Sequence, residues 1–423
     1  MPFQPQPLSA AAPVSQRIDR CRSCGSSHLS LVLDLGALPL ANRLLGPDDN
    51  DADEPYVPLT LVFCSDCSLV QITDTVAPEI LFRQYPYCSS FSDEVLSLSK
   101  RHAESLVASR RLQPSSLVVE LASNDGYLLQ YFVAAGIPVL GVEPAVNVAA
   151  IARQRQVPTR TEFFGFEAAS AMRREGIAAD VVIAKNVLAH VADINGFVAG
   201  VREILKADGV AQLEFPYVRN MVDQTQFDTI YHEHLCYLSA TAVDHLARRN
   251  GLVFTDVEEI SIHGGSLRVT LARRAAPTGR KRVDALLDAE QRLGLHQVGY
   301  YRALSDRVDR LRDDLARLLG DLKRQGARLV GYGASAKGAI LLNAFGIGPN
   351  VLEYLVDRSS LKQGKLAPGT RLPIVSPDRL LQDRPDYALL LAWNFADEVL
   401  EQQAAYRAAG GRFIVPIPKL AIV

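Results

Sequence analysis

The sequence has neither a long apolar run nor an excess of charge of one sign. No stretch approaches the roughly 18 to 20 apolar residues that a membrane-spanning helix needs. The first 20 residues also lack the basic segment and the hydrophobic core of a secretory signal. Lysine and arginine number 45, aspartate and glutamate 47, and the net charge of −2 indicates no basic surface for nucleic acid or an anionic membrane. We therefore expect a cytoplasmic protein, a monomer or weak homodimer, whose partners are small molecules.

Cysteine is scarce too, yet four of the six cysteines stand in two CxxC pairs, CRSC and CSDC. In a reducing cytosol such pairs favour metal over disulfides, and thiolates suit tetrahedral Zn²⁺. Free thiols or a redox pair are the alternative, because the gap between the pairs exceeds the usual spacing of roughly 15 to 20 residues. If protein fills all four coordination positions, the ion folds residues 1–75 and leaves no place for substrate. The predicted zinc ligands are Cys21, Cys24, Cys64 and Cys67.

Alternating apolar and amphipathic segments after the cysteines predict an α/β fold. The apolar segments are expected to form a parallel sheet with helices on both faces. They are residues 116–121, 137–144, 180–190 and 209–218. Two later strands, 251–260 and 265–274, are joined by a short HGG turn and should pair antiparallel. A parallel sheet closed by such a hairpin resembles the class I methyltransferase fold.

The last third of the chain predicts two further parts. An Arg/Leu-rich helical segment is interpreted as a linker with a solvated face, with an oligomerisation helix as the alternative. A second, smaller doubly wound α/β pattern follows it. The expected domains are a zinc-ribbon-like module (1–75), a Rossmann-like methyltransferase domain (76–275), a helical linker (276–325) and a C-terminal Rossmann-like domain (326–423).

Two strand-to-helix turns are candidate ligand sites. In VVELASNDGYLL, Glu120 ends a strand and residues 123–126 form the turn, against which a cofactor would lie. Glu143 ends the next strand in GVEP, where an acidic side chain can take both ribose hydroxyls of an adenosine. In GYGASAKG, Lys337 and a serine hydroxyl at a helix N-terminus suit a diphosphate, and Asp357 downstream could bind a ribose or base. For each turn, a plain structural turn is the alternative.

The motifs also occur in an order that resembles one enzyme family. The succession CxxC…CxxC, ELASNDGYLL, GVEP, AKNVLAHVAD, EFPYV, YHEHLCYLS, HGGSLRV and GYGASAKG is similar to the bacterial deoxysugar C-methyltransferases, which act on nucleotide-linked keto-sugars. The resemblance covers nearly the whole chain. It implies S-adenosylmethionine in the central domain, zinc in the N-terminal module, and a C-terminal domain that helps to hold the nucleotide of a dTDP-sugar.

Site residues are expected accordingly. The cofactor-binding candidates are Glu120, Ala122, Ser123, Asn124, Asp125, Gly126, Glu143, Pro144 and Asn186. The substrate-binding candidates are Tyr87, His190, Ser335, Lys337, Asp357 and Arg358. For Tyr85, Tyr87, Asn186 and His190 a structural role is an equal alternative.

The motif YHEH is the candidate catalytic centre. It is not the HExxH of a zinc protease, because a cysteine stands where the second histidine belongs. Methylation of carbon beside a ketone needs a base near neutral pKa and a donor for the developing oxyanion. We expect His234 to be the base, as the resemblance also implies, with Glu233 and Tyr231 orienting it or the sugar. His232 is expected to be structural, Tyr85 matches the family's active-site tyrosine, and packing by all four YHEH residues is the alternative.

The sequence therefore predicts methyl transfer from S-adenosylmethionine to a ring carbon, C3 or C5, next to the ketone of a dTDP-4-keto-deoxysugar, through an enolate. One rival is an NAD-dependent nucleotide-sugar oxidoreductase that uses GYGASAKG, although neither turn contains GxGxxG. The other rival is a non-enzymatic zinc-ribbon scaffold.

Overall fold

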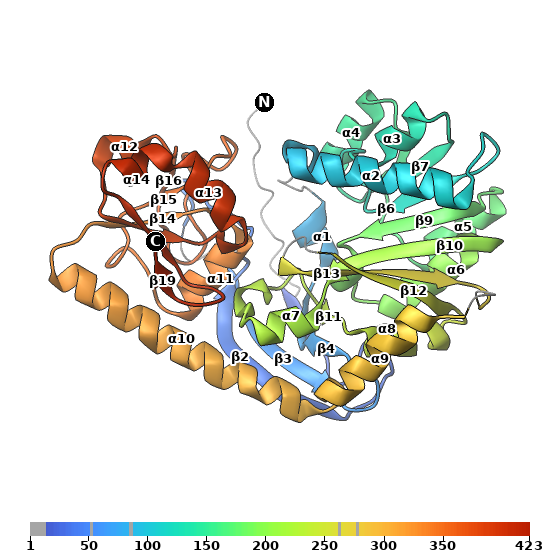
Figure 1. Cartoon of the computed structure of the whole chain (residues 1–423), viewed down its shortest axis with the longest axis horizontal. Helices are drawn as coiled ribbons and strands as arrows, with labels where there is room; N and C mark the ends of the chain where they lie inside the picture. Colours follow the sequence, from blue (N-terminus) through green and yellow to red (C-terminus); the bar gives the residue numbers. More distant parts are fainter. Residues whose placement is uncertain (1–13, 51–53, 84–87, 261–263, 276–278) are drawn as a thin grey trace.

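The computed structural model describes residues 14–50, 54–83, 88–260, 264–275 and 279–423. Figure 1 shows two α/β modules on opposite sides of the molecule, with strands β2 and β3 extending between them. Both modules are built around mostly parallel sheets, and the extended strands belong to a third, antiparallel sheet. The three sheets correspond to the three folded parts that the sequence predicts.

The N-terminal module is a four-stranded antiparallel sheet in the order β11-β4-β3-β2. Its strands are β2 (Leu29–Pro39), β3 (Tyr56–Cys64), β4 (Val70–Ile72) and β11 (Cys236–Tyr237). A small second sheet pairs β1 (Ser15–Arg17) with β5 (Asp74–Val76). Strand β11 lies about 160 residues beyond β4 in the sequence and directly follows the YHEH motif. The sheet therefore crosses the domain boundary expected at residue 75.

The central module has seven strands in the order β12-β13-β10-β9-β6-β7-β8. They are β6 (Val118–Leu121), β7 (Val139–Val142), β8 (Thr159–Arg160), β9 (Ala179–Lys185), β10 (Leu205–Pro216), β12 (Val253–Ile260) and β13 (Ser266–Ala272). Strands β8, β7, β6, β9 and β10 run parallel, whereas β13 pairs antiparallel with both β10 and β12. The parallel sheet and its antiparallel hairpin are as predicted.

Helices cover both faces of this sheet, because the apolar strands need burial on both sides. The longer ones are α2 (Asp93–Arg110), α3 (Leu129–Ala134), α4 (Val146–Gln154), α5 (Phe166–Arg174), α6 (Ile194–Ile204), α7 (Val218–Asp223) and α8 (Ala240–Arg249). Shorter turns are α1 (Pro78–Phe82), η2 (Ser89–Phe91), η3 (Leu188–His190) and η4 (Phe227–Thr229). Ser92 begins α2 and Ser239 begins α8, each accepting a hydrogen bond from a backbone N–H of the first turn.

The segment expected as a linker forms helices α9 (Lys281–Leu293) and α10 (Val298–Arg324). One face of α10 is buried, including Leu304, Leu315 and Leu319, and the helix packs on β2. The ring of Tyr301 stacks on Phe63 of β3 with centroids 4.9 Å apart. The helix α10 therefore packs against the N-terminal module and also connects the two α/β modules. Within the parts of the chain that the structure describes, none of the helices combines the length and apolar composition needed to cross a membrane.

The C-terminal module is a six-stranded sheet in the order β16-β15-β14-β17-β18-β19. Its strands are β14 (Leu329–Tyr332), β15 (Leu355–Val356), β16 (Ile374–Val375), β17 (Tyr387–Leu390), β18 (Arg412–Val415) and β19 (Ala421–Ile422). Its helices are α11 (Ala336–Ala344), α12 (Arg379–Asp383), η6 (Trp393–Phe395), α13 (Ala396–Gln402) and α14 (Ala404–Ala408). All strand pairs except β18 with β19 are parallel, which gives the doubly wound sheet that was predicted.

Candidate active site and zinc centre

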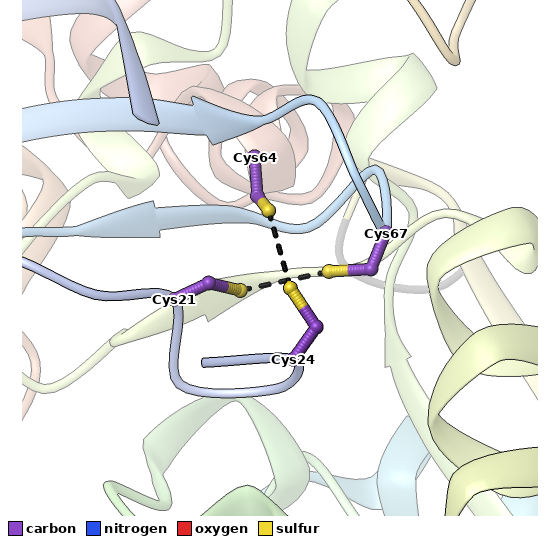
Figure 2. A group of neighbouring side chains, drawn as sticks. All are labelled: Cys21, Cys24, Cys64 and Cys67. Carbon is purple, nitrogen blue, oxygen red and sulfur yellow. Dashed lines mark hydrogen bonds between the residues drawn. The ribbon is translucent and has the colours of Figure 1, made fainter. Parts of the chain in front are cut away.

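The four predicted zinc ligands come together (Figure 2). The Sγ atoms of Cys21 and Cys67 are 3.5 Å apart, as are those of Cys24 and Cys64, and all four lie within 4.8 Å of one another. With Zn–S bonds of about 2.3 Å, tetrahedral sulfurs stand about 3.8 Å apart. The two turns have the same form, because the amide of Gly25 donates to the Cys21 carbonyl and the amide of Ser68 to the Cys64 carbonyl. The four thiols fit a closed structural zinc site.

The cofactor candidates line the carboxyl edge of the central sheet, where strands β6, β7 and β9 end. Open α/β sheets bind ligands at this edge, at the point where the strand order reverses. Glu143 follows β7, and both of its oxygens are held by backbone amides, Asn124 N at 2.9 Å and Ala145 N at 2.8 Å. Burial raises the pKa of this carboxyl. Each oxygen of Glu143 keeps a second lone pair that can accept a hydrogen bond from a ligand hydroxyl. The candidate Pro144 is the next residue in the turn.

The backbone at this edge is strained. Ala122, Asn124 and Asn186 have φ of 55°, 49° and 52°, in the left-handed region, and Gly126 has φ of 77°. For residues other than glycine, such conformations cost about 1 to 3 kcal/mol each, and they cluster at ligand sites. Asparagine tolerates this region better than other residues, so Ala122 carries most of the strain. Left-handed residues at the ends of two neighbouring strands fit a ligand site at this edge.

Buried polar atoms without partners lie in the same place. Among the described residues, no hydrogen bond is made by either carboxylate oxygen of Glu120, by Ser123 Oγ, by Asp125 Oδ1 or by Asn186 Oδ1. Burial raises the pKa of Glu120. A buried polar atom left unpaired costs about 1 to 3 kcal/mol, so such a cluster fits a polar ligand. This donor set suits the amino acid and ribose groups of S-adenosylmethionine.

The segment before α2, residues 82–92, is called the connector here, and its residues Ser89 and Ser90 are hydrogen-bonded to this turn. The Ser89 amide donates to Asn124 Oδ1 at 2.9 Å, and the Ser90 hydroxyl donates to Asp125 Oδ2 at 2.5 Å. Arg155 pairs with the same Asp125 carboxylate at 3.0 Å. The described residues of the connector are thus hydrogen-bonded to the cofactor turn. The candidates Tyr85 and Tyr87 stand in this connector but lie outside the described residues.

The geometry of the YHEH motif defines the protonation of His234. Its Nδ1 is 2.8 Å from the Thr229 carbonyl oxygen, which can only accept, so Nδ1 carries the proton. In the neutral ring Nε2 is then the acceptor, and it lies 2.8 Å from the Tyr231 hydroxyl. The Tyr231 and His234 rings are 3.9 Å apart. The motif therefore presents a basic nitrogen already in contact with a phenol.

The two other YHEH residues face the zinc module. His232 is buried and its Nε2 donates to the Val57 carbonyl of β3 at 3.0 Å. Glu233 is 5% exposed, and the Asn42 amide donates to its Oε1 at 2.6 Å. Burial raises the pKa of Glu233 to about 7, and the Asn42 hydrogen bond opposes that rise. Glu233 Oε2 has no partner among the residues described, so one oxygen is free to meet substrate.

His190, on η3 after β9, lies beside His234. Their ring centroids are 4.8 Å apart in an edge-to-face arrangement. Burial lowers the pKa of His190 to about 4, so the ring is neutral near pH 7. Its Nδ1 has no partner within the described segments. The structure thus groups His190 with the candidate base, at the same sheet edge as Asn186.

The candidates of the C-terminal module lie in two turns, Ser335 and Lys337 after β14, and Asp357 and Arg358 after β15. Ser335 begins α11 and accepts a hydrogen bond from the Gly338 amide, while the Lys337 ammonium lies 4.4 Å from the centre of the Trp393 ring. Asp357 follows β15 and accepts hydrogen bonds from the Ala334 and Ser359 amides, both at 2.8 Å.

Arg358, the next residue, lines an open cavity of about 370 Å³ together with Gln363 and Ser376. Glycine is required in the GYGASAKG turn, because Gly333 has φ of 97° and a Cβ there would lie 2.9 Å from the Ala392 Cβ. The turn thus meets structural demands as well as presenting polar groups.

Sequence reasoning missed four contributors: Asn42, Asp228, the Thr229 carbonyl and Trp393. Asn42 lies in an unremarkable loop, and its contact with Glu233 spans 191 positions. Asp228 and Thr229 lie three and two residues before the motif, and Trp393, the chain's one tryptophan, begins η6 shortly after strand β17. These positions could have been flagged, but nothing in the sequence pairs them.

The strand order of the central sheet and the backbone at its carboxyl edge define a class I methyltransferase domain. The cysteine cluster adds a zinc module to it. Three family models match consecutive segments: a zinc binding domain (21–82), a methyltransferase domain (92–257) and a C-methyltransferase C-terminal domain (261–418). The C-methyltransferase NovU of Streptomyces niveus is 36% identical over 407 residues, covering 96% of this chain and 97% of that protein. The chain belongs to this C-methyltransferase family.

Two solved structures are similar to part of the chain. One is magnesium protoporphyrin IX methyltransferase of Synechocystis PCC 6803 with bound SAM, at 17% identity and a TM-score of 0.33, covering 42% of this chain and 79% of that chain. The other is the glycopeptide N-methyltransferase MtfA complexed with S-adenosyl-L-methionine, at 16% identity and a TM-score of 0.33, covering 45% and 99%. At such TM-scores neither likeness bears on function.

The predicted enzyme class and cofactors are confirmed by the family. The protein is an S-adenosylmethionine-dependent C-methyltransferase with a zinc-binding N-terminal module. The rival classes, an NAD-dependent oxidoreductase and a non-enzymatic scaffold, are set aside.

Proposed function

We propose that the enzyme methylates a ring carbon, C3 or C5, next to the ketone of a dTDP-4-keto-deoxysugar, and that His234 removes the proton from that carbon. The observation that carries the proposal is the Nδ1 hydrogen bond of His234 to the Thr229 carbonyl, because it leaves Nε2 as a base. The His234 ring lies next to the ring of His190, with centroids 4.8 Å apart, and His190 belongs to η3, which follows β9. The similar C-methyltransferase NovU supports transfer to carbon.

The residues act in a definite order. Bound S-adenosylmethionine supplies an electrophilic methyl group. His234 Nε2 takes the α-proton, and the electron pair of the broken C–H bond moves onto the ketone oxygen. The Tyr231 hydroxyl, which contacts Nε2 at 2.8 Å in the structure, is the proposed hydrogen-bond donor for that oxygen. As the enolate collapses, the ketone C=O re-forms and the α-carbon takes the methyl group, while the electron pair of the broken S–CH3 bond would stay on the sulfur of S-adenosylhomocysteine, the leaving group. The proton stays on His234 until it passes to solvent.

Glu233 orients the sugar in this proposal. The Asn42 amide holds Oε1, which leaves Oε2 for a sugar hydroxyl or amino group. With a pKa of about 7, the carboxyl exists in both protonation states near neutral pH, so it can donate as well as accept. His190, kept neutral by burial, adds no positive charge that would disfavour protonation of His234.

The C-terminal module is proposed to bind the nucleotide. Its carboxyl edge offers the helix α11 N-terminus at Ser335, the Lys337 ammonium and the Arg358 guanidinium, which suit a diphosphate. Asp357 is the candidate for the ribose or base. The reducing cytoplasm is the compartment that suits a four-thiolate zinc site, so we propose that location for the enzyme.

A labelled-methyl assay tests this function. The protein is incubated with methyl-¹³C S-adenosylmethionine and a panel of dTDP-4-keto-deoxysugars, with dTDP-sugars that lack the ketone as controls. Label should appear as a methyl group on a carbon next to the ketone, only in the keto-sugars, and should be lost with His234→Ala. Label on oxygen or nitrogen, or equal labelling of sugars without a ketone, would refute the proposal.

A further inference from the structure

A buried contact joins the C-terminal module to the turn η4 that precedes the YHEH motif. Asp228, the middle residue of η4, is 0% exposed. The indole Nε1–H of Trp393 donates to its Oδ2 at 2.6 Å. The other oxygen, Oδ1, has no partner within the described parts of the chain. Trp393 therefore supplies the hydrogen bond that compensates for burying this carboxyl.

Two more contacts from the C-terminal module reach the same turn. The Lys337 ammonium lies over the Trp393 ring at 4.4 Å, and its charge favours the ionised form of Asp228. The Phe227 ring of η4 stacks on Phe345, at the end of α11, with centroids 4.8 Å apart. Burial nevertheless raises the pKa of Asp228 to about 6. Two of the three side chains of η4, those of Phe227 and Asp228, therefore contact the C-terminal module.

The third residue of η4, Thr229, contacts the candidate base. Its carbonyl oxygen accepts the Nδ1–H of His234 at 2.8 Å. A single 3₁₀ turn has few hydrogen bonds of its own, and η4 is closed by Thr229 N to Gln226 O at 3.1 Å. The Thr229 hydroxyl also donates to the Gln226 carbonyl at 2.8 Å, and the Tyr237 hydroxyl donates to the Thr229 carbonyl at a long 3.5 Å. The contacts of Phe227 and Asp228 with the C-terminal module therefore add to the few bonds that orient this carbonyl. If the Thr229 carbonyl turned away, Nδ1 would lose its acceptor and the ring could place its proton on Nε2 instead.

We propose that Asp228 and Trp393 are positioning residues for methylation: through η4 the C-terminal module fixes the Thr229 carbonyl, and this carbonyl keeps His234 in the tautomer with an unprotonated Nε2. The inference rests on the proposed role of His234 as the base. It gives the C-terminal module a part in proton removal in addition to nucleotide binding.

Trp393→Phe tests the inference, because it keeps an aromatic ring near Lys337 while it removes the N–H donor together with part of the buried ring. The first readout is hydrogen exchange at the α-carbon of the keto-sugar in D₂O, with S-adenosylhomocysteine in place of the methyl donor. We expect the exchange rate to fall about 10- to 100-fold, the effect of misplacing a catalytic group by about 1 Å, with unchanged affinity for S-adenosylmethionine. The second readout is the ¹⁵N spectrum of His234, whose signals are assigned by their absence in His234→Gln. In Trp393→Phe this spectrum should no longer show a ring protonated at Nδ1 alone.

Asp228 and a matched variant complete the design. Asp228→Ala should lower exchange as Trp393→Phe does, and Asp228→Asn should restore much of the loss, since its amide oxygen can still accept the indole N–H. The control is Tyr406→Phe, which removes another buried hydrogen bond of the C-terminal module, to the Pro385 carbonyl at 3.0 Å, away from η4. It should lose stability without changing exchange or the His234 spectrum.

The outcomes separate this inference from the proposed function. Wild-type exchange and an unchanged His234 tautomer in both Trp393→Phe and Asp228→Ala would overturn the positioning role, as would an equal fall in Tyr406→Phe. The tautomer readout does not require His234 to be the base. If His234→Ala exchanges at the wild-type rate, the proposed function fails, whereas the link from Trp393 to the His234 tautomer is still decided by the spectrum.

Discussion

Glu233→Gln should make the protein more stable at alkaline pH while impairing its catalysis. The Glu233 carboxyl is 5% exposed and accepts one hydrogen bond, from Asn42. Burial raises its pKa from the ordinary 4.5 to about 7. Glutamine keeps the size and the acceptor oxygen for Asn42 but never has to ionise. The variant therefore isolates the free energy of holding this carboxylate in the active site.

The sign and size of this stability difference follow from the proton that Glu233 binds in the folded and unfolded states. Between pH 4.5 and 7 the folded protein holds a proton on Glu233 that the unfolded chain has released, so wild-type stability falls as pH rises through this window. The shift of about 2.5 pK units corresponds to about 3 kcal/mol once pH exceeds 7. Less than half of that loss is present at pH 5.5, so the advantage of the variant should grow by about 2 kcal/mol between pH 5.5 and 8.5.

Denaturant unfolding of wild type and variant, in parallel at several pH values, measures this difference. Glu94→Gln, at an exposed position in the first turn of α2, is the control for the loss of one negative charge. The reasoning is refuted if the stability difference between Glu233→Gln and wild type is the same at pH 5.5 and 8.5. It is also refuted if Glu94→Gln shows an equal gain.

Four further outcomes are expected. The purified protein should contain about one zinc per chain, and Cys64→Ser should lose it, unfold the N-terminal sheet and lower activity, because β11 beside YHEH pairs with β4; a metal-free active protein would contradict this. Glu143→Ala should weaken S-adenosylmethionine binding by about 1 to 3 kcal/mol in calorimetry, and unchanged affinity would place the cofactor elsewhere. Lys337→Ala should raise the KM for the dTDP-sugar and leave S-adenosylmethionine affinity intact; the opposite pattern would move the cofactor to the C-terminal module. Asn42→Ala should raise the pKa assigned to Glu233 in the pH profile of kcat/KM, since its hydrogen bond favours the carboxylate, and an unshifted profile would disprove the contact.

The parts of the fold that the sequence predicts are those with local signals. Strands such as VVEL are buried on both faces and appear in the sequence as short apolar runs, and their alternation with amphipathic segments predicts the parallel sheet. The short spacing between the two last apolar segments predicts the antiparallel pairing of β12 and β13, and the CxxC spacing predicts the cluster of four sulfurs. The turn at Ser123 and the acidic Glu143 follow the same logic, because position after a strand decides what reaches the sheet edge.

The rest depends on contacts between distant segments. The pairing of β11 with β4 joins the motif to the N-terminal module, although the sequence predicted a module that ends at residue 75. Asn42 touches Glu233, and Trp393 touches Asp228 across 165 positions. The helix α10 was expected to have a solvated face, and one face is solvated while the other packs on β2. Long-range pairings of this kind have no periodic signature in a single sequence.

Hydrogen exchange at the sugar is the most direct test of the central claim, that His234 takes the proton from the carbon to be methylated. The wild-type enzyme, with S-adenosylhomocysteine bound, should exchange the α-hydrogen of the dTDP-4-keto-sugar for deuterium, as followed by proton NMR. His234→Ala should abolish this exchange, a loss on the order of 10² to 10⁴ for a general base, and Tyr231→Phe should slow it less. Exchange at the wild-type rate in His234→Ala, with none in Tyr231→Phe, would contradict the account and assign the base to the tyrosine.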